Sequence, residues 1–168
     1  MVSCTPNPQE CGGTGGCDGA TAELGYEYVK EKGISSEATL PYRGQTGKCV
    51  ETTKAANITG YVKLPTNDHD ALLNAIATVG PIAITVAASE WMDFENGVFD
   101  GCAKDADLDH GVQLVGYGTD GSNDYWLVRN SWGPAWGEKG YIRLKRFGTS
   151  DAWCGTDHNP LDGTGCKG

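Results

Sequence analysis

Seven cysteines among 168 residues constrain the fold of this chain more than any other feature of its sequence. Such a density of cysteines is typical of proteins that fold in an oxidising compartment, where disulfides persist. The first residues, Met1 to Cys4, lack the basic start and apolar run of a secretory signal. We therefore expect a mature fragment of a longer precursor, with a truncated gene product and a cytosolic protein with free thiols as alternatives.

The composition predicts an acidic globular protein. Hydrophobic residues make up 39% of the chain and charged residues 21%, which is ordinary for a folded domain. The net charge of −9 argues against nucleic acid or an anionic membrane as a partner, because both require clustered Lys and Arg. The longest apolar stretch, residues 81–88, is far shorter than the roughly 20 residues that span a bilayer, so no membrane span is expected.

No metal or cofactor site is predicted. A zinc cluster of Cys4, Cys11 and Cys17 would have C-x6-C-x5-C spacing, which does not match the usual ligand spacing. His69 and His158 have no predicted partner, and we interpret both as solvated or locally bonded residues.

The periodicity of apolar residues predicts an α+β protein. Helices are expected over 20–32, with Gly33 as a left-handed cap, and over 69–78, with Asn67 or Asp68 as the amino-terminal cap. Short strands rich in branched and aromatic residues follow at 82–87, 111–117, 125–129 and 141–145. We expect a helical, disulfide-linked part over 1–60 and an antiparallel β part over 61–168.

A predicted hairpin brings together a histidine and an asparagine. If the loop over 118–124 is centred near Asp120, His110 lies directly opposite Asn130, with Cβ atoms about 5 Å apart. The amide oxygen then accepts the imidazole Nδ1 proton and leaves Nε2 to exchange a proton with a thiol. Trp132 is expected to cover the pair. The alternatives are an ordinary hydrogen-bonded histidine and a tryptophan that only packs in the core.

Two longer motifs surround these residues. The segments DHGVQLVGYG, residues 109–118, and YWLVRNSWG, residues 125–133, resemble the histidine and asparagine signatures of the papain-like cysteine peptidases. The resemblance extends through WGEKGYI at 136–142, VGPI at 79–82, Tyr42 and VSC at 2–4. It implies a papain-like two-domain α+β fold, here incomplete, with His110 and Asn130 as catalytic residues and Trp132 as their support.

The nucleophile of that family is missing from these residues. In the family it lies in a C-G-[SA]-C-[WY] segment, and the histidine follows about 130–150 residues downstream. Counting back by that many residues from His110 leads to a position before Met1. We expect a companion amino-terminal segment to bring the catalytic cysteine, and this chain alone to be inactive. Endopeptidase action is the default expectation. The alternatives are an inactive truncated homologue that acts as a binding or structural subunit, and an incomplete record of one continuous enzyme.

The resemblance also assigns contacts with a polypeptide substrate or inhibitor. Asp18 and Gly19 correspond to the backbone edge that binds an extended peptide. The substrate-binding positions are completed by Thr21, Ala22, Ala88, Asp109 and Asn159. Ala20 replaces a common glycine, and Asn159 makes a usually apolar pocket more polar.

Disulfide pairing follows from the same resemblance. The family pattern joins Cys4 with Cys49 and Cys102 with Cys154, and it pairs Cys17 with a cysteine of the missing segment. If Cys11 pairs with Cys166, Cys17 alone is left unpaired or bonded to another chain. A lysosomal, vacuolar or secreted location is expected, and Asn57-Ile58-Thr59 fits the N-glycosylation pattern.

Overall fold

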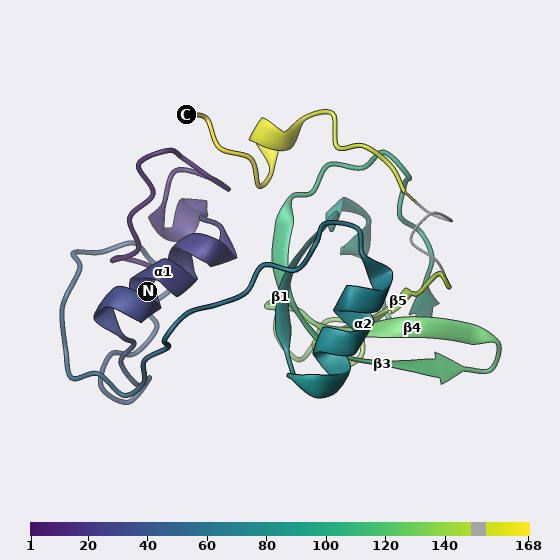
Figure 1. Ribbon diagram of the computed structural model, residues 1–168, viewed down its shortest axis with the longest axis horizontal. Coiled ribbons are helices and arrows are strands. Elements are labelled where there is room, and N and C mark those ends of the chain that lie inside the picture. Colours follow the sequence, from purple (N-terminus) through teal and green to yellow (C-terminus); the bar gives the residue numbers. More distant parts are fainter. Residues whose placement is uncertain (149–153) are drawn as a thin grey trace. The chain divides into compact units, whose positions relative to one another are not determined.

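The computed structural model describes residues 1–148 and 154–168. The chain divides into two compact units, which are described separately: unit 1 contains Met1–Lys63 and Pro160–Gly168, and unit 2 contains Leu64–Asn159 (Figure 1). The last nine residues therefore belong to unit 1, whereas the prediction assigned them to the β part over 61–168. A disulfide joins Cys11 to Cys166, and the Gly12 N–H donates to the Gly165 carbonyl over 3.0 Å. These bonds hold the tail against the first residues.

Unit 1 contains one α-helix, α1 (Ala22–Lys32), and two short 3-10 helices, η1 (Gly16–Asp18) and η4 (Pro160–Asp162). Helix α1 starts two residues later than predicted and ends at Gly33. Gly33 has a φ of +74° and donates its N–H to the Val29 carbonyl, as expected for a glycine cap. Val29 and Gly25 are the buried residues of this helix.

The glycine-rich loop of unit 1 is held by Asn7 and one disulfide. The Asn7 amide donates to the Cys11 and Gly13 carbonyls and accepts the Cys11 N–H. A Cβ at Gly13 would lie 1.8 Å from the Asp18 carbonyl oxygen, so only glycine fits there. The second disulfide of unit 1 joins Cys4 to Cys49.

Unit 2 is built on a five-stranded sheet with the strand order β1-β3-β4-β5-β2. The strands are β1 (Ile82–Val86), β2 (Val98–Phe99), β3 (His110–Asp120), β4 (Asn123–Arg129) and β5 (Tyr141–Lys145). All neighbours are antiparallel except β2 and β5, which are parallel. The sheet is therefore mixed, and the prediction of a purely antiparallel unit was wrong because a two-residue strand leaves no alternating pattern.

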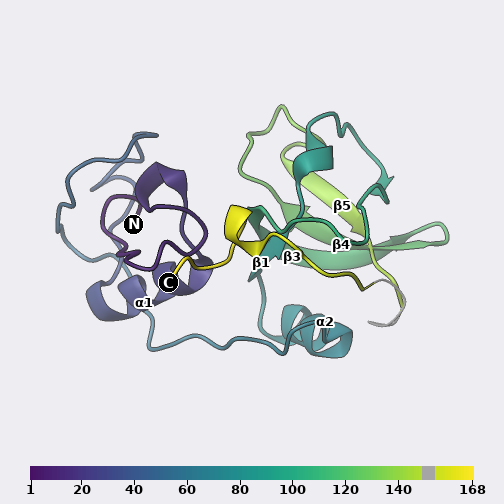
Figure 2. The ribbon, with the colours of Figure 1, turned by 90° about the horizontal axis from the view of Figure 1, so that it is seen from above.

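Helix α2 (His69–Thr78) lies on one side of this sheet (Figures 1 and 2). Its bounds agree with the prediction, and the Asp68 carboxylate caps it by accepting the Ala71 N–H over 2.9 Å. Ile76 is the buried residue of the helix. It belongs to the core of unit 2, whose buried members are Ile76, Ala88, Trp91, Leu114, Val128 and Ile142.

The hairpin between β3 and β4 has a different register from the predicted one. Asp120 pairs with Asn123, so the loop consists of Gly121 and Ser122. Gly121 has the positive φ that a type II′ turn requires at its first central position. A bulge lies between Leu114 and Gly116. Gly116 pairs with Leu127 on one side of it, and Leu114 pairs with Val128 on the other. The ladder therefore does not pair His110 with Asn130.

The predicted disulfide between Cys102 and Cys154 is absent from the structure. Among the described residues, disulfides are formed by the other two predicted pairs, Cys4–Cys49 and Cys11–Cys166. The two sulfurs have different surroundings. Cys154 lines a cavity with His69 and Trp126, whereas the half-buried Cys102 lies beside Trp91. Burial raises the pKa of the Cys102 thiol, and the neighbouring Trp91 indole partly offsets this rise.

Candidate active site

His110 is the first residue of β3, and its ladder partner is Val86 at the end of β1. Asn130 follows the last residue of β4 and donates its backbone N–H to the Gly140 carbonyl over 2.9 Å. Because Gln113 pairs with Arg129, Asn130 lies diagonally across the ladder from His110. Diagonal neighbours are about 7–8 Å apart at their backbones, a gap that two long polar side chains can close.

The two side chains do meet, since Nε2 of His110 lies 2.8 Å from Oδ1 of Asn130. The same oxygen accepts the Ser131 N–H over 2.8 Å, and only an amide oxygen can accept that proton. The orientation of the amide is thereby fixed, so Nε2 must be the donor to Oδ1. In the neutral imidazole, Nδ1 is then the unprotonated nitrogen and is able to accept a proton.

This geometry corrects the predicted roles of the two ring nitrogens. The predicted register placed Asn130 at Nδ1 and left Nε2 for a thiol, whereas Nε2 is the nitrogen that bonds to Asn130. The prediction assumed that the two residues lie directly opposite each other, whereas the register places them diagonally. Asn130 is 8% exposed, so the bond is formed in surroundings that exclude most water and strengthen it.

Aromatic rings surround the imidazole on the described part of unit 2. Trp132 lies beside it with ring centroids 5.3 Å apart and planes tilted by 31°. Trp91, fully buried, meets the imidazole edge-on at 6.4 Å, and Trp136 stacks on Trp91 at 6.1 Å. The Trp136 indole N–H donates to the Trp91 carbonyl over 3.0 Å. The indoles thus limit rotation of the His110 ring and shield its bond to Asn130.

The other unit 2 candidates lie around the segment that leads into β3. Asp109 donates its N–H to the Val86 carbonyl, and its carboxylate accepts the Ala88 N–H over 2.9 Å. Ala88 is 5% exposed and belongs to the core. The exposed Asn159 side chain donates to Asp107 over 3.4 Å. Asp109 thereby fixes the backbone of Ala88 next to the strand end that carries His110.

The remaining candidates lie in unit 1. Asp18 ends η1 and is exposed, and Gly19 follows it with a φ of +101°. Thr21 precedes α1, and Ala22 is its first residue. Four of the seven predicted substrate contacts are thus grouped within a few residues of one another, on a different unit from His110.

Sequence reasoning missed Trp91 as a neighbour of His110. Trp91 lies in the 3-10 helix η2 (Ser89–Trp91), a single turn that carries no periodic signal. No cluster of His, Cys, Asp and Glu that could bind a metal is found in the described ranges. Nor does any helix described here have the length and apolar character to span a membrane.

Comparison with known proteins shows which family the chain belongs to. Residues 1–164 match the family described as papain family cysteine protease. The chain is 45% identical over 149 residues to vignain from Phaseolus vulgaris, a match that covers 83% of this chain and 40% of vignain. It is 41% identical over 150 residues to a cathepsin L-like proteinase from Phaedon cochleariae, covering 86% of this chain and 45% of that protein.

A solved structure of bromelain from Ananas comosus, in complex with the E64 inhibitor, superposes with a TM-score of 0.76 at 35% identity. The superposition covers 87% of this chain and 70% of bromelain. The chain spans less than half the length of the vignain and cathepsin L-like relatives. The match over residues 1–164, together with these identities, shows that the chain belongs to the papain family of cysteine proteases.

Proposed function

We propose that this chain is the part of a papain-like cysteine peptidase that supplies the catalytic histidine and asparagine. The observation that carries the proposal is the bond from Nε2 of His110 to Oδ1 of Asn130, which leaves Nδ1 as the proton acceptor. Trp132 beside the imidazole supports the same role. The reaction is hydrolysis of a peptide bond, with endopeptidase action as the default.

In the proposed mechanism, Nδ1 of His110 takes the proton of a cysteine thiol, and the resulting ion pair lowers the pKa of that thiol. The thiolate attacks the peptide carbonyl, and the imidazolium returns its proton to the leaving amine as the C–N bond breaks. A water molecule, deprotonated by Nδ1, then hydrolyses the thioester, and the thiol is restored. Asn130 keeps the imidazole in one orientation and one tautomer throughout.

The nucleophilic cysteine comes from a companion segment, since no C-G-[SA]-C-[WY] motif occurs among the 168 residues. We propose that Cys17 links the two pieces. It is exposed and is not part of either disulfide. Bond formation removes two electrons and two protons from the two thiols, and a disulfide oxidant such as oxidised glutathione accepts them.

The proposed substrate is an extended polypeptide. Asp18 and Gly19 would offer backbone groups to it, and the other proposed substrate-binding residues are Thr21, Ala22, Ala88, Asp109 and Asn159. The support for these positions is the family membership of the chain. A lysosomal, vacuolar or secreted location is proposed from the two disulfides and from the same relatives.

Complementation tests the proposal. The chain is mixed with a separately produced segment that carries the family's cysteine motif, and hydrolysis of a peptide substrate is followed under mild reduction. We expect activity with both pieces and none with either piece alone. The His110→Ala chain, mixed with the same segment, should lose at least a thousandfold of that activity, because base catalysis of thiol attack is gone.

A second reading is a non-catalytic binding subunit, which the absence of a nucleophile motif from these residues favours. Labelling with a thiol-reactive epoxide, the class of probe suited to an activated thiolate, separates the two. The peptidase proposal requires rapid labelling of the companion cysteine in the complex, and slower labelling with the His110→Ala chain. Equal labelling with both chains would favour the binding subunit.

A further inference from the structure

Asn96 and Gly97 form the only Asn-Gly pair in the chain. They lie in the loop between η2 and β2, and Asn96 is exposed. Gly97 has no Cβ to keep its backbone nitrogen away from the side-chain carbonyl of the residue before it. A Cβ placed there would meet nothing within 4 Å, so the surroundings leave room for a close approach. The loop therefore brings together the two groups that form a cyclic imide.

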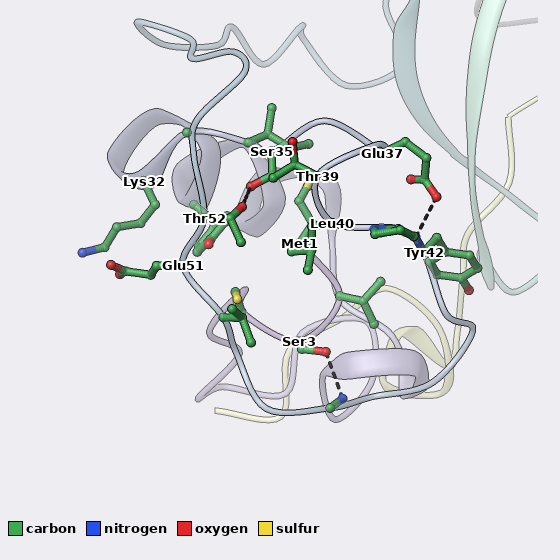
Figure 3. Close-up of a pocket in the computed structure, with 18 of the residues that line it drawn as sticks. Met1, Ser3, Lys32, Ser35, Glu37, Thr39, Leu40, Tyr42, Glu51 and Thr52 are labelled. Carbon is green, nitrogen blue, oxygen red and sulfur yellow. Dashed lines mark hydrogen bonds between the residues drawn. The ribbon is translucent and has the colours of Figure 1, made fainter.

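The Gly97 N–H is held by a carboxylate, since it donates to Oε1 of Glu138 over 3.0 Å. Unit 1 has a bond of the same kind, in which the Glu37 carboxylate accepts the Tyr42 N–H over 2.7 Å (Figure 3). Pro41 precedes Tyr42 and carries no carboxamide, so that bond only shapes a loop. At Gly97 the same bond occupies the nitrogen that would attack the preceding side chain.

Arg143 fixes the Glu138 carboxylate in this position. Its guanidinium donates from Nε to Oε2 over 2.8 Å and from Nη2 to Oε1 over 2.6 Å. The guanidinium lowers the pKa of Glu138 below its ordinary value of 4.5, so the side chain is a carboxylate at neutral pH. Charge-assisted bonds of this kind are stronger than neutral ones. Glu138 therefore stays aimed at Gly97 while β5, which contains Arg143, is folded.

A carboxylate at this place can either protect the Gly97 N–H or remove its proton. Removal is the weaker effect, because a carboxylate with a lowered pKa is a poor base for a peptide N–H. Its negative charge also opposes a second negative charge on the nitrogen. The bond must break before the nitrogen can turn towards the Asn96 side chain. Glu138 therefore slows the ring closure.

We propose that Asn96 is a site of self-modification, in which its side-chain amide is hydrolysed through a cyclic imide with Gly97, and that the bond to Glu138 holds the reaction back in the folded chain. In the first step the Gly97 nitrogen bonds to Cγ of Asn96, its proton passes to Nδ2, and the Cγ–Nδ2 bond breaks to release ammonia. Water then opens the imide at either carbonyl. The products are aspartate, or isoaspartate in which the chain continues through the side-chain carboxyl group.

The products would weaken a short strand. Strand β2 follows the modified loop directly and pairs with β5 only through Val98 and Phe99. Isoaspartate lengthens the backbone just before this pairing, and both products add a negative charge. The Phe99 ring meets Phe94 edge-on at 6.0 Å, and Phe94 packs on Trp136 at 5.7 Å. Modification would therefore loosen the aromatic cluster beside the candidate active site, whichever reaction that site performs.

Mass spectrometry of the digested chain tests the inference. The full 168-residue chain is incubated in neutral buffer, folded or unfolded in urea, and the fraction of Asn96 converted is followed over time. We expect conversion to be at least about tenfold faster in urea, because unfolding breaks the protecting bond. In the folded chain, Glu138→Ala should raise the rate about fivefold, which corresponds to the loss of one hydrogen bond. Glu95→Ala, at an exposed position nearby, should change it less than about twofold.

Conversion of Asn130 reports on the fold in the same samples, because this residue is 8% exposed and reacts only when unit 2 opens. If Glu138→Ala does not fold, Glu138→Asp replaces it, since the shorter side chain keeps the charge but draws the oxygen away from Gly97. It should raise the rate at least about twofold. Equal rates in the folded and unfolded chain, or an unchanged rate in a folded Glu138 variant, would overturn the inference. A rise that Asn130 shares would overturn the protecting role of Glu138.

Discussion

Trp91 lies edge-on to His110, with ring centroids 6.4 Å apart and planes at 88°, although the two residues come from different segments of unit 2. The indole is completely buried and also stacks on Trp136. The proposed catalytic imidazole is thereby supported from within the core, while Trp132 covers it from a more exposed side at 37% exposure. The orientation of the base therefore depends on packing as well as on Asn130.

This relationship predicts a stability effect at Trp91. Trp91→Phe should destabilise unit 2 by about 1–3 kcal/mol, and Trp91→Ala by about 3–5 kcal/mol, because each leaves a space in a core that cannot fully collapse. Urea unfolding followed by circular dichroism measures both changes. The neighbouring Met92→Ala is the control, since Met92 is 71% exposed and its loss should change stability by less than about 0.5 kcal/mol. Equal effects at both positions would contradict this prediction.

A second prediction concerns pH. The Glu138 carboxylate accepts hydrogen bonds from Arg143 at 2.8 and 2.6 Å and from the Gly97 N–H at 3.0 Å. The Arg143 guanidinium lowers the pKa of Glu138 below its ordinary value of 4.5. Since the folded pKa is depressed, this stabilisation is fully present above pH 4.5 and is lost as pH falls through the lower, folded value.

Replacing Glu138 by Gln should therefore cost about 1 kcal/mol near pH 6, and the difference from the unmodified chain should shrink below pH 4. Arg143 keeps its bond to Asp120 at 2.6 Å, which limits the loss. Unfolding at pH 6, 4 and 3 gives the comparison, with Glu95→Gln at an exposed position as the matched control. A difference that grows towards acid pH would show that the sign is wrong.

The two disulfides should differ in their contribution to stability. Cys11–Cys166 closes a sequence separation of 155 residues, and Cys4–Cys49 closes one of 45. The entropy of loop closure then predicts that replacing Cys11 and Cys166 by Ser costs about 1 kcal/mol more than replacing Cys4 and Cys49. Urea unfolding of the two double variants, without reductant, measures the order. A larger loss on removing the shorter loop would contradict the chain-entropy account.

Local signals predicted the elements well. The bounds of α2 and β5 agree with the prediction because an Asp cap, a Gly-Pro stop and a short stretch with aromatic and branched residues act within a few positions. The hairpin register was missed because it depends on a two-residue loop and a bulge after Leu114, which alternation alone does not reveal. The predicted roles of the two His110 nitrogens, which assumed directly opposed residues, were wrong as well.

Features that depend on distant segments were less accessible. Nothing near Trp91 in sequence indicated that it would contact His110, and β2 is too short for a pattern. The predicted Cys102–Cys154 pair came from family resemblance, and the structure does not contain it. The predicted substrate contacts follow from resemblance alone and fall on both units, so they stay predictions.

The tautomer of His110 gives the most direct test of the central claim that Asn130 holds Nε2 and leaves Nδ1 to act as the base. Long-range ¹H–¹⁵N NMR of the chain, at a pH where the imidazole is neutral, distinguishes the protonated from the bare ring nitrogen. His69 and His158, the other two histidines, report on the fold in the same spectrum. We expect the proton on Nε2, and a mixture of tautomers in Asn130→Ala. A proton on Nδ1, or a tautomer that Asn130→Ala leaves unchanged, would contradict the claim.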